Sequence, residues 1–167
     1  MARNNSETIQ CLINPDWREL GHARVTLVQS EKKKVLAVSF LVDLFCLGVK
    51  STMGQKLPFN AAAGFIEMIY FDGRPSPIPL DFAKDVVYGA IKYAKNLGFN
   101  PDPDFNDWKY ALGDENEKPT NSIRFGDPDN NGKPLYVVGP EDPVDEIIAT
   151  LQKNVGKDGF SIIRPED

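Results

Sequence analysis

Apolar and polar side chains alternate from Ala23 to Leu27, which is the period of a half-buried strand. A nearly continuous apolar run follows at residues 35–47, and β-branched and aromatic residues dominate it. Such a run is typical of a strand that is covered on both faces. Residues 32–34 between the two segments are all lysine. The pattern therefore predicts a β-hairpin over residues 23–47 with a charged turn at its tip.

Helical periodicity marks a second class of segment. The segments with apolar residues at helical spacing are 61–71, 81–97 and 142–155. Gly98 and Gly156 follow the second and third of these, where glycine commonly ends a helix. Two shorter helical segments are expected, one through Trp17 to Leu20 and one over residues 105–112. Three main helices therefore accompany the hairpin.

Glycine, proline and polar residues interrupt these patterns. Residues 48–60 contain Gly48, Gly54 and Pro58 and are expected to form a loop, and the polar residues 113–121 are expected to be a disordered loop. Strand-like residues at 122–125 and 135–138 flank a turn rich in Asp, Asn and Gly, which predicts a second hairpin. This order of elements favours an α+β fold, with two β-hairpins forming a mainly antiparallel sheet packed against three main helices.

The length of 167 residues suits one domain that buries its own core without disulfides or metal. We expect a single domain over residues 8–167 and a flexible N-terminus over residues 1–7. The net charge of −5 disfavours a large nucleic-acid interface, because such interfaces draw on Lys and Arg, although it leaves room for a local basic patch.

The cysteines and the hydropathy pattern indicate a cellular location. Two cysteines, Cys11 and Cys46, are too few for a disulfide framework, so both are expected to be free thiols. The longest apolar run is too short to span a bilayer, and we expect no signal peptide at the start of the chain. These features predict a cytoplasmic protein without membrane contact.

Two strings of residues carry a resemblance to other proteins. Residues 40–50 read Phe-Leu-Val-Asp-Leu-Phe-Cys-Leu-Gly-Val-Lys, and residues 97–105 read Leu-Gly-Phe-x-Pro-x-x-Asp-Phe. They resemble motifs of an uncharacterised family of bacterial proteins. The resemblance implies a bacterial, cytoplasmic origin and brings no activity and no catalytic residue. In that family a histidine is expected in the turn before the Asp-Phe pair, where this chain has Asp102.

Asp43 is the one acid inside the long apolar run. A buried carboxylate without a partner is costly, so Asp43 is either a structural hydrogen-bond hub or a site residue. As a hub it would accept hydrogen bonds from backbone N–H groups or a hydroxyl near residues 48–52. As a site residue it would join Glu67 and either Asp81 or Asp85 in holding the cations of a metal-dependent phosphodiesterase or nuclease.

Other motifs are incomplete. Gly48-Val49-Lys50 lacks the glycine that precedes the lysine of a phosphate-binding loop. Asp127, Asp129 and Asn131 match the first half of a calcium loop, but the closing acid is absent and a hairpin turn uses the same residue types. This set is therefore a weak metal candidate. A single histidine, His22, gives little support to zinc or triad chemistry.

The candidate binding residues are Trp17, Lys50, Trp108 and Tyr136, because aromatic and long basic side chains dominate recognition surfaces. No complete motif for a nucleotide, a metal or covalent catalysis is present. We therefore predict a small intracellular module that binds another macromolecule, most simply a protein, without catalytic activity or cofactor. The alternative is the phosphodiesterase centred on Asp43.

Overall fold

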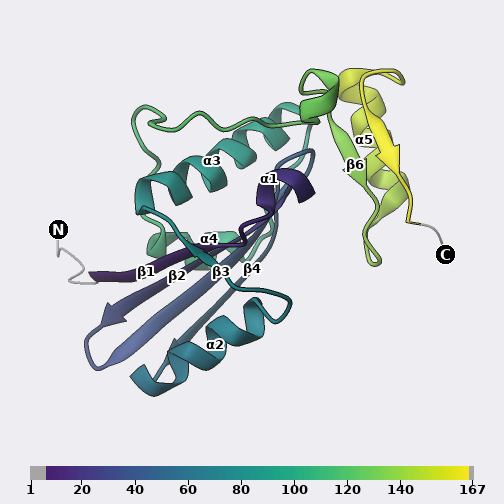
Figure 1. Ribbon diagram of the computed structural model, residues 1–167. Coiled ribbons are helices and arrows are strands. Elements are labelled where there is room, and N and C mark those ends of the chain that lie inside the picture. The colour runs from purple at the N-terminus through teal and green to yellow at the C-terminus, as the bar shows by residue number, and fades with distance from the viewer. Residues whose placement is uncertain (1–6, 166–167) are drawn as a thin grey trace.

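The computed structural model describes residues 7–165 (Figure 1). Its fold is mixed α+β, and its main sheet has five antiparallel strands in the order β4-β3-β2-β1-β5. The strands are β1 (Glu7–Ile13), β2 (His22–Glu31), β3 (Lys34–Asp43), β4 (Gly48–Leu57) and β5 (Ser76–Pro77). The flexible segment predicted for residues 1–7 lies outside the described residues except for Glu7, where β1 begins.

The hairpin predicted over residues 23–47 is formed by the pairing of β2 with β3, but β3 ends at Asp43 and residues 44–47 are a turn instead of a strand. The loop predicted for residues 48–60 is wrong over most of its length, because β4 pairs with β3 from Gly48 to Leu57. Glycine is unfavourable in a strand, but at Gly54 the ring of Trp108 occupies the space that a side chain would fill. Tertiary packing therefore overrides the local loop signal.

Within the described residues, five α-helices accompany the sheet: α1 (Trp17–Leu20), α2 (Ala62–Ile69), α3 (Leu80–Asn96), α4 (Phe105–Trp108) and α5 (Val144–Val155). The longest three are α2, α3 and α5, which match the three predicted helices to within a few residues. Figure 1 shows α2 on one face of the sheet and α3 on the other. On the α3 face, Val38 and Phe40 belong to one buried apolar cluster with Val86 and Ala90.

The C-terminal elements form a smaller unit at one end of the sheet (Figure 1). Here β6 (Leu135–Val137) pairs in parallel with β7 (Ser161–Ile163), and α5 connects them. Parallel strands need such a crossover, whereas a hairpin joins antiparallel ones. The second hairpin predicted from residues 122–125 and 135–138 is therefore not formed, and residues 122–125 have no regular structure.

A second buried apolar cluster holds this unit to the rest of the molecule. Its members are Cys46, Leu97, Tyr136, Ile147, Leu151 and Phe160. Cys46 comes from the turn between β3 and β4, and Leu97 comes from the end of α3. Backbone bonding adds to this contact, since the N–H of Leu135 donates to the carbonyl of Phe45 at 3.1 Å. The two cores are thus joined through the β3–β4 turn.

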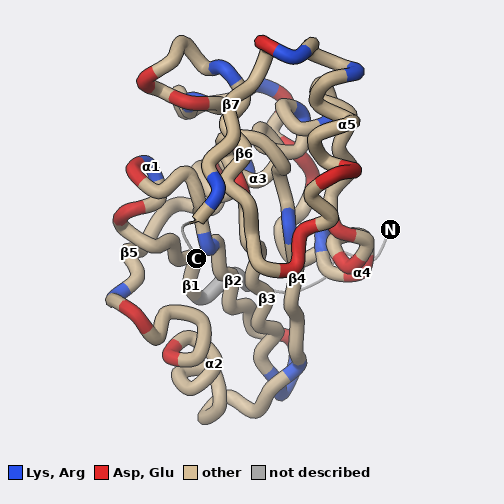
Figure 2. The backbone as a smooth tube through the Cα atoms, turned by 90° about the vertical axis from the view of Figure 1, so that its right-hand side faces the viewer, with Lys and Arg blue, Asp and Glu red and all other residues tan. Residues whose placement is uncertain are grey.

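Other segments of the chain partly cover the two edges of the main sheet. On β4, the carbonyl of Val49 accepts from the N–H of Asp102 at 3.0 Å, and the N–H of Thr52 donates to Asp102 Oδ2 at 3.0 Å. Figure 2 shows the acidic turn that leads into α4 lying beside β4. At the opposite edge, β5 has only two residues, and Pro77 in it has no N–H to donate.

Cys11 and Cys46 are free and buried, as predicted. None of the helices within residues 7–165 has the length and apolar character needed to cross a membrane.

Candidate functional site

A cleft of about 410 Å³ opens beside α1 on the face of the sheet that α2 covers. Successive strand residues point to opposite faces, and Phe40 belongs to the α3 core. Leu41 and its cross-strand partner Arg24 therefore project to the α2 face, where both line the cleft. The remaining walls come from α1 with its preceding turn and from residues 70–74 after α2.

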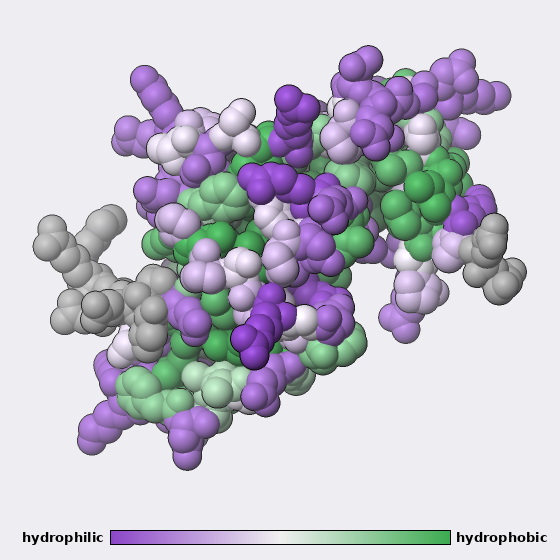
Figure 3. Space-filling view, viewed as in Figure 1, coloured by the Kyte–Doolittle hydropathy of each residue, from purple (hydrophilic) through white to green (hydrophobic). Residues whose placement is uncertain are grey.

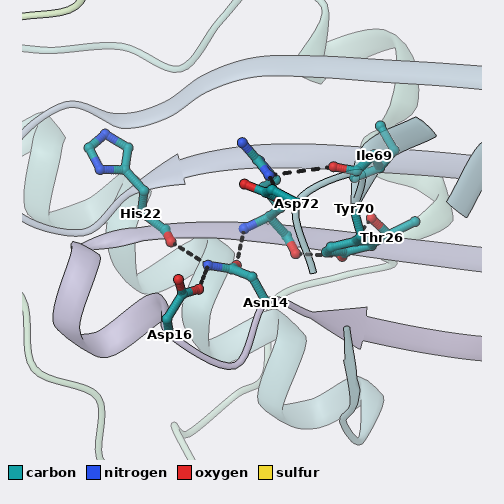
Figure 4. Close-up of polar contacts among 8 residues, drawn as sticks. Asn14, Asp16, His22, Thr26, Ile69, Tyr70 and Asp72 are labelled. Atoms are coloured by element: carbon teal, nitrogen blue, oxygen red, sulfur yellow. Dashed lines mark hydrogen bonds and ion pairs between the residues drawn. The ribbon is translucent and has the colours of Figure 1, made fainter. Parts of the chain in front are cut away.

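Asn14 fixes one wall of the cleft to β2 (Figure 4). Its Nδ2 donates to Asp16 Oδ1 at 2.9 Å and to the carbonyl of His22 at 3.0 Å, and its Oδ1 accepts from the N–H of Arg24 at 2.7 Å. Asparagine suits this position because its amide offers donors and an acceptor on one short side chain. The turn before α1 is thereby held against the start of β2.

Arg24 holds the opposite wall. Its Nη1 donates to Asp72 Oδ1 at 3.0 Å and lies 3.5 Å from the carbonyl of Ile69. Its guanidinium also lies 5.6 Å from the ring centre of Phe71. An ion pair this exposed adds little stability, so its main effect is to position the segment after α2.

Tyr70 ties the end of α2 to the sheet beneath it (Figure 4). Its hydroxyl lies 2.6 Å from the carbonyl of Arg24 and 2.9 Å from Thr26 Oγ1, which itself donates to Ser39 at 3.0 Å. Burial raises the pKa of Tyr70 well above its usual value, so the hydroxyl stays protonated. Its role here is to position α2.

The chemistry that the cleft offers is recognition by mixed polar and apolar contacts. Arg24 and Arg74 supply positive charge, Asp16 and Asp72 supply negative charge, and Leu20 with Leu41 supplies apolar surface. Among the side chains of residues 10–165, no group of three or more His, Cys, Asp or Glu residues is arranged to hold a metal ion.

The three acids of the alternative hypothesis do not meet. Asp43 is buried at the end of β3, Glu67 is exposed on α2, and Asp85 belongs to α3 across the sheet from α2. Asp81, the other acid considered, also lies on α3. The geometry of these acids gives no support to a shared cation site.

Asp43 has the contacts of a structural hub. Its Oδ1 accepts from the N–H of Phe45 and its Oδ2 from the N–H of Leu47, both at 3.0 Å. These donors belong to the turn between β3 and β4, just before the predicted residues 48–52. Burial raises the pKa of Asp43 above its usual value, and nearby His22, the two N–H groups and Lys50 oppose that rise.

Asp85 has an equally structural environment. It accepts from Asn116 Nδ2 at 2.8 Å, from the N–H of Thr120 at 3.1 Å, and from the N–H and Nδ2 of Asn121 at 2.9 and 3.0 Å. Desolvation acts to raise the pKa of Asp85, but these hydrogen bonds outweigh it and lower the pKa. The segment 113–121, predicted to be disordered, is thus anchored to α3.

Lys50 and Tyr136, two of the predicted binding residues, both contact the carboxylate of Asp142. Lys50 Nζ lies 3.4 Å from Asp142 Oδ1, and the hydroxyl of Tyr136 donates to Asp142 Oδ2 at 3.0 Å. The N–H of Gly139 donates to the same oxygen at 2.8 Å. Tyr136 is fully buried, so it forms no recognition surface. The cluster instead joins β4 to the C-terminal unit.

The two tryptophans lie in different environments. Trp17 is buried and packs edge-to-face on Phe82, with ring centres 5.8 Å apart. Trp108 is half-buried over Gly54 and stacks on Tyr110 at 6.4 Å. Trp17 therefore contributes mainly to the core. Trp108 packs partly against the core and leaves the rest of its ring exposed.

The weak metal candidate is a self-capped turn. The side chain of Asp127 accepts from the N–H of Asp129 at 3.0 Å, and its carbonyl accepts from the N–H of Gly132 at 2.8 Å. Asn131 has a left-handed backbone with φ of 53°. Asp, Asn and Gly are what this turn requires for its own backbone geometry.

Sequence reasoning did not find Arg24, Tyr70 and Asp72 as members of one cleft. Arg24 precedes Asp72 by 48 positions, and no local spacing connects a strand residue with the turn after a distant helix. The one sequence signal for this cleft was Arg24, a charged residue on the predicted first strand of the hairpin.

No protein-family model, curated protein or solved structure matches the chain.

Proposed function

We propose that the chain is a protein-binding module and that it binds through the face of the sheet that carries α2. The observation that carries this proposal is the position of exposed apolar side chains. Of the seven large hydrophobic side chains most exposed among residues 10–165, five lie on or beside this face. They are Leu20, Met53, Phe59, Met68 and Phe71, and we call them the α2 patch.

The sequence of α2 supports this proposal. A surface helix normally has an apolar stripe toward the core and a polar face toward solvent. Here the helix has the sequence Ala-Ala-Gly-Phe-Ile-Glu-Met-Ile, and Glu67 is its one charged residue. Phe65 is buried against the sheet, while Met68 is 51% exposed and Phe71 beyond the helix is 78% exposed. Figure 3 shows hydrophobic residues at the surface in several places, and the lower part of the molecule, where α2 lies, is one of them.

The surroundings of the α2 patch are polar. The cleft beside it has charges of both signs, from Arg24 and Arg74 and from Asp16 and Asp72. An apolar centre with a polar rim is the usual composition of an interface between proteins that also exist apart. Exposed apolar patches in soluble proteins commonly mark such interfaces.

Location forms part of the same proposal. We place the protein in the bacterial cytoplasm because of the resemblance of residues 40–50 and 97–105 to motifs of a bacterial family. The free state of both thiols fits a reducing compartment.

The test compares matched exposed residues. Met68→Asp and Phe71→Asp place a charge on the α2 patch, whereas Ile163→Asp changes a side chain in the C-terminal unit that is as exposed as Met68, at 50%. A protein captured from a bacterial lysate is purified, and its affinity for each variant is measured directly. We expect Met68→Asp and Phe71→Asp to weaken binding by about tenfold or more, as at interface hot spots, and Ile163→Asp to leave it unchanged. Equal binding by all variants, or no captured protein, would contradict the proposal.

A further inference from the structure

A separate pocket of about 340 Å³ lies on the other side of α1 from the cleft, between α1, the β3–β4 turn and the loop at residues 122–128. The short helix α1 divides the two hollows, because Trp17 and Arg18 line this pocket while Leu20 lines the cleft. The volume of the pocket is in the range of small-molecule sites.

The floor of this pocket is apolar and held in place from behind. Trp17, Leu44 and Phe45 form it, and all three are at least nine-tenths buried. The N–H of Leu44 donates to the carbonyl of Gly21 at 2.8 Å, and its carbonyl accepts from the N–H of Gly126 at 2.9 Å. Since its backbone is fixed on both sides, the floor is formed before any ligand arrives.

The charges that line this pocket are all positive. Arg18 and Arg124 are exposed and line it, and no acidic side chain does. Neither arginine forms an ion pair in the described part of the chain. The cleft beside it, by contrast, has two acids as well as two arginines. On a protein with a net charge of −5, this is a local concentration of unpaired positive charge.

Arg18 is also partly oriented. Its guanidinium carbon lies 4.2 Å from the ring centre of Trp17, a cation–π distance. A stacked guanidinium keeps its planar edge of donors free for a carboxylate or phosphate group. The hydroxyl of Ser122 adds a further polar group at the wall.

From these features we infer that this pocket binds a small organic anion, a compact apolar or aromatic group bearing one carboxylate or phosphate. The apolar body would cover Leu44, Phe45 and the edge of Trp17, and the anionic group would lie between Arg18 and Arg124. The apolar floor favours such a ligand over an inorganic ion, because covering apolar surface adds binding free energy. The two unpaired arginines favour it over a neutral compound. This inference goes beyond the proposed function, because it concerns a different surface and a different class of ligand.

The probe is phenyl phosphate, titrated into the full chain by calorimetry and by NMR. We expect saturable binding that shifts the indole N–H signal of Trp17 and not that of Trp108. Inorganic phosphate, which lacks the ring, and benzyl alcohol, which lacks the charge, should each bind about tenfold more weakly or not at all.

Variants locate the site. Arg18→Gln and Arg124→Gln should each weaken phenyl phosphate binding by about tenfold. Arg74→Gln in the cleft is the matched control and should have no effect, and Met68→Asp should have none either. Thermal melts check that every variant is folded. Absence of saturable binding, equal affinity for inorganic phosphate, or equal loss with Arg74→Gln would overturn the inference.

Discussion

The buried carboxylate of Asp43 accepts hydrogen bonds from two backbone N–H groups of the β3–β4 turn. Its removal should therefore lower the free energy of unfolding. Asp43→Ala leaves the N–H groups of Phe45 and Leu47 without acceptors and should lower the free energy of unfolding by roughly 2–3 kcal/mol. Asp43→Asn keeps one acceptor and should cost about 1–2 kcal/mol. Urea denaturation of the wild type and both variants measures these differences.

The opposite order of stabilities would change the interpretation of Asp43. If Asp43→Asn were more stable than the wild type, the carboxylate would be a crowded charge kept for another purpose, as in many active sites. The metal-dependent phosphodiesterase would then have to be reconsidered. Glu31→Gln, on the same sheet and in an ion pair with Lys56, is a control for the general effect of removing an acid.

Sequence reasoning at this scale succeeded where one residue conflicted with its neighbours. Asp43 was identified because an acid stands out in an apolar run. The donors it binds were placed a few residues too late, because the turn folds back tightly within residues 44–47. Arg24 and Asp72 could not be connected in advance, since only the packing of α2 on the sheet brings them together.

Among the elements, the segment 113–121 depends on one side chain of α3. Asp85→Asn removes the charge that accepts from Thr120 and Asn121 and should cost about 1–2 kcal/mol. Backbone amides of Thr120 and Asn121 should then exchange with solvent faster at neutral pH. Hydrogen exchange followed by NMR measures this, with exposed Asp107→Asn on α4 as the control.

The pH dependence of the same segment follows from the lowered pKa of Asp85. A group whose pKa is lower in the folded state than in the unfolded chain stabilises the fold above its unfolded value, about 3.9 for Asp. That stability is lost as the pH falls through the lowered pKa. Protection of Thr120 and Asn121 in the wild type should therefore persist at pH 5 and decline in stronger acid. Unchanged protection in Asp85→Asn would contradict this anchoring role.

Helices and strands were predictable wherever the local sequence pattern agreed with the structure that tertiary packing favours. The helices α3 and α5 have clear periodicity and end near Gly98 and Gly156. The strand β4 was missed because Gly48, Gly54 and Pro58 are loop signals, and its pairing with β3 outweighs them. The pairing of β6 with β7 was missed because the connection through α5 brings together strands distant in sequence.

For the whole molecule, the ion pair of Asp142 with Lys50 adds to the apolar cluster that attaches the C-terminal unit. Tyr136→Phe removes one hydrogen bond and should lower the free energy of unfolding by about 1 kcal/mol. Asp142→Ala should cost more, roughly 2–3 kcal/mol, because the Tyr136 hydroxyl, the Gly139 N–H and Lys50 all lose their partner. Thermal melts measure both, and Asp158→Ala on the exposed surface is the control. A smaller loss for Asp142→Ala than for Tyr136→Phe would contradict the central place of Asp142 in this cluster.

The partners that occupy the outer strands have a consequence for self-assembly. An unprotected edge strand can recruit a strand of another molecule, which is how many proteins begin to aggregate. Here Asp102 occupies backbone groups of Val49 and Thr52 on β4, and a neighbouring chain would meet its negative charge. At the other edge, the short β5 contains a proline. Addition of another strand beside Val49 and Thr52 is therefore hindered, and concentrated solutions should resist conversion to fibrils while Asp102 holds these backbone groups.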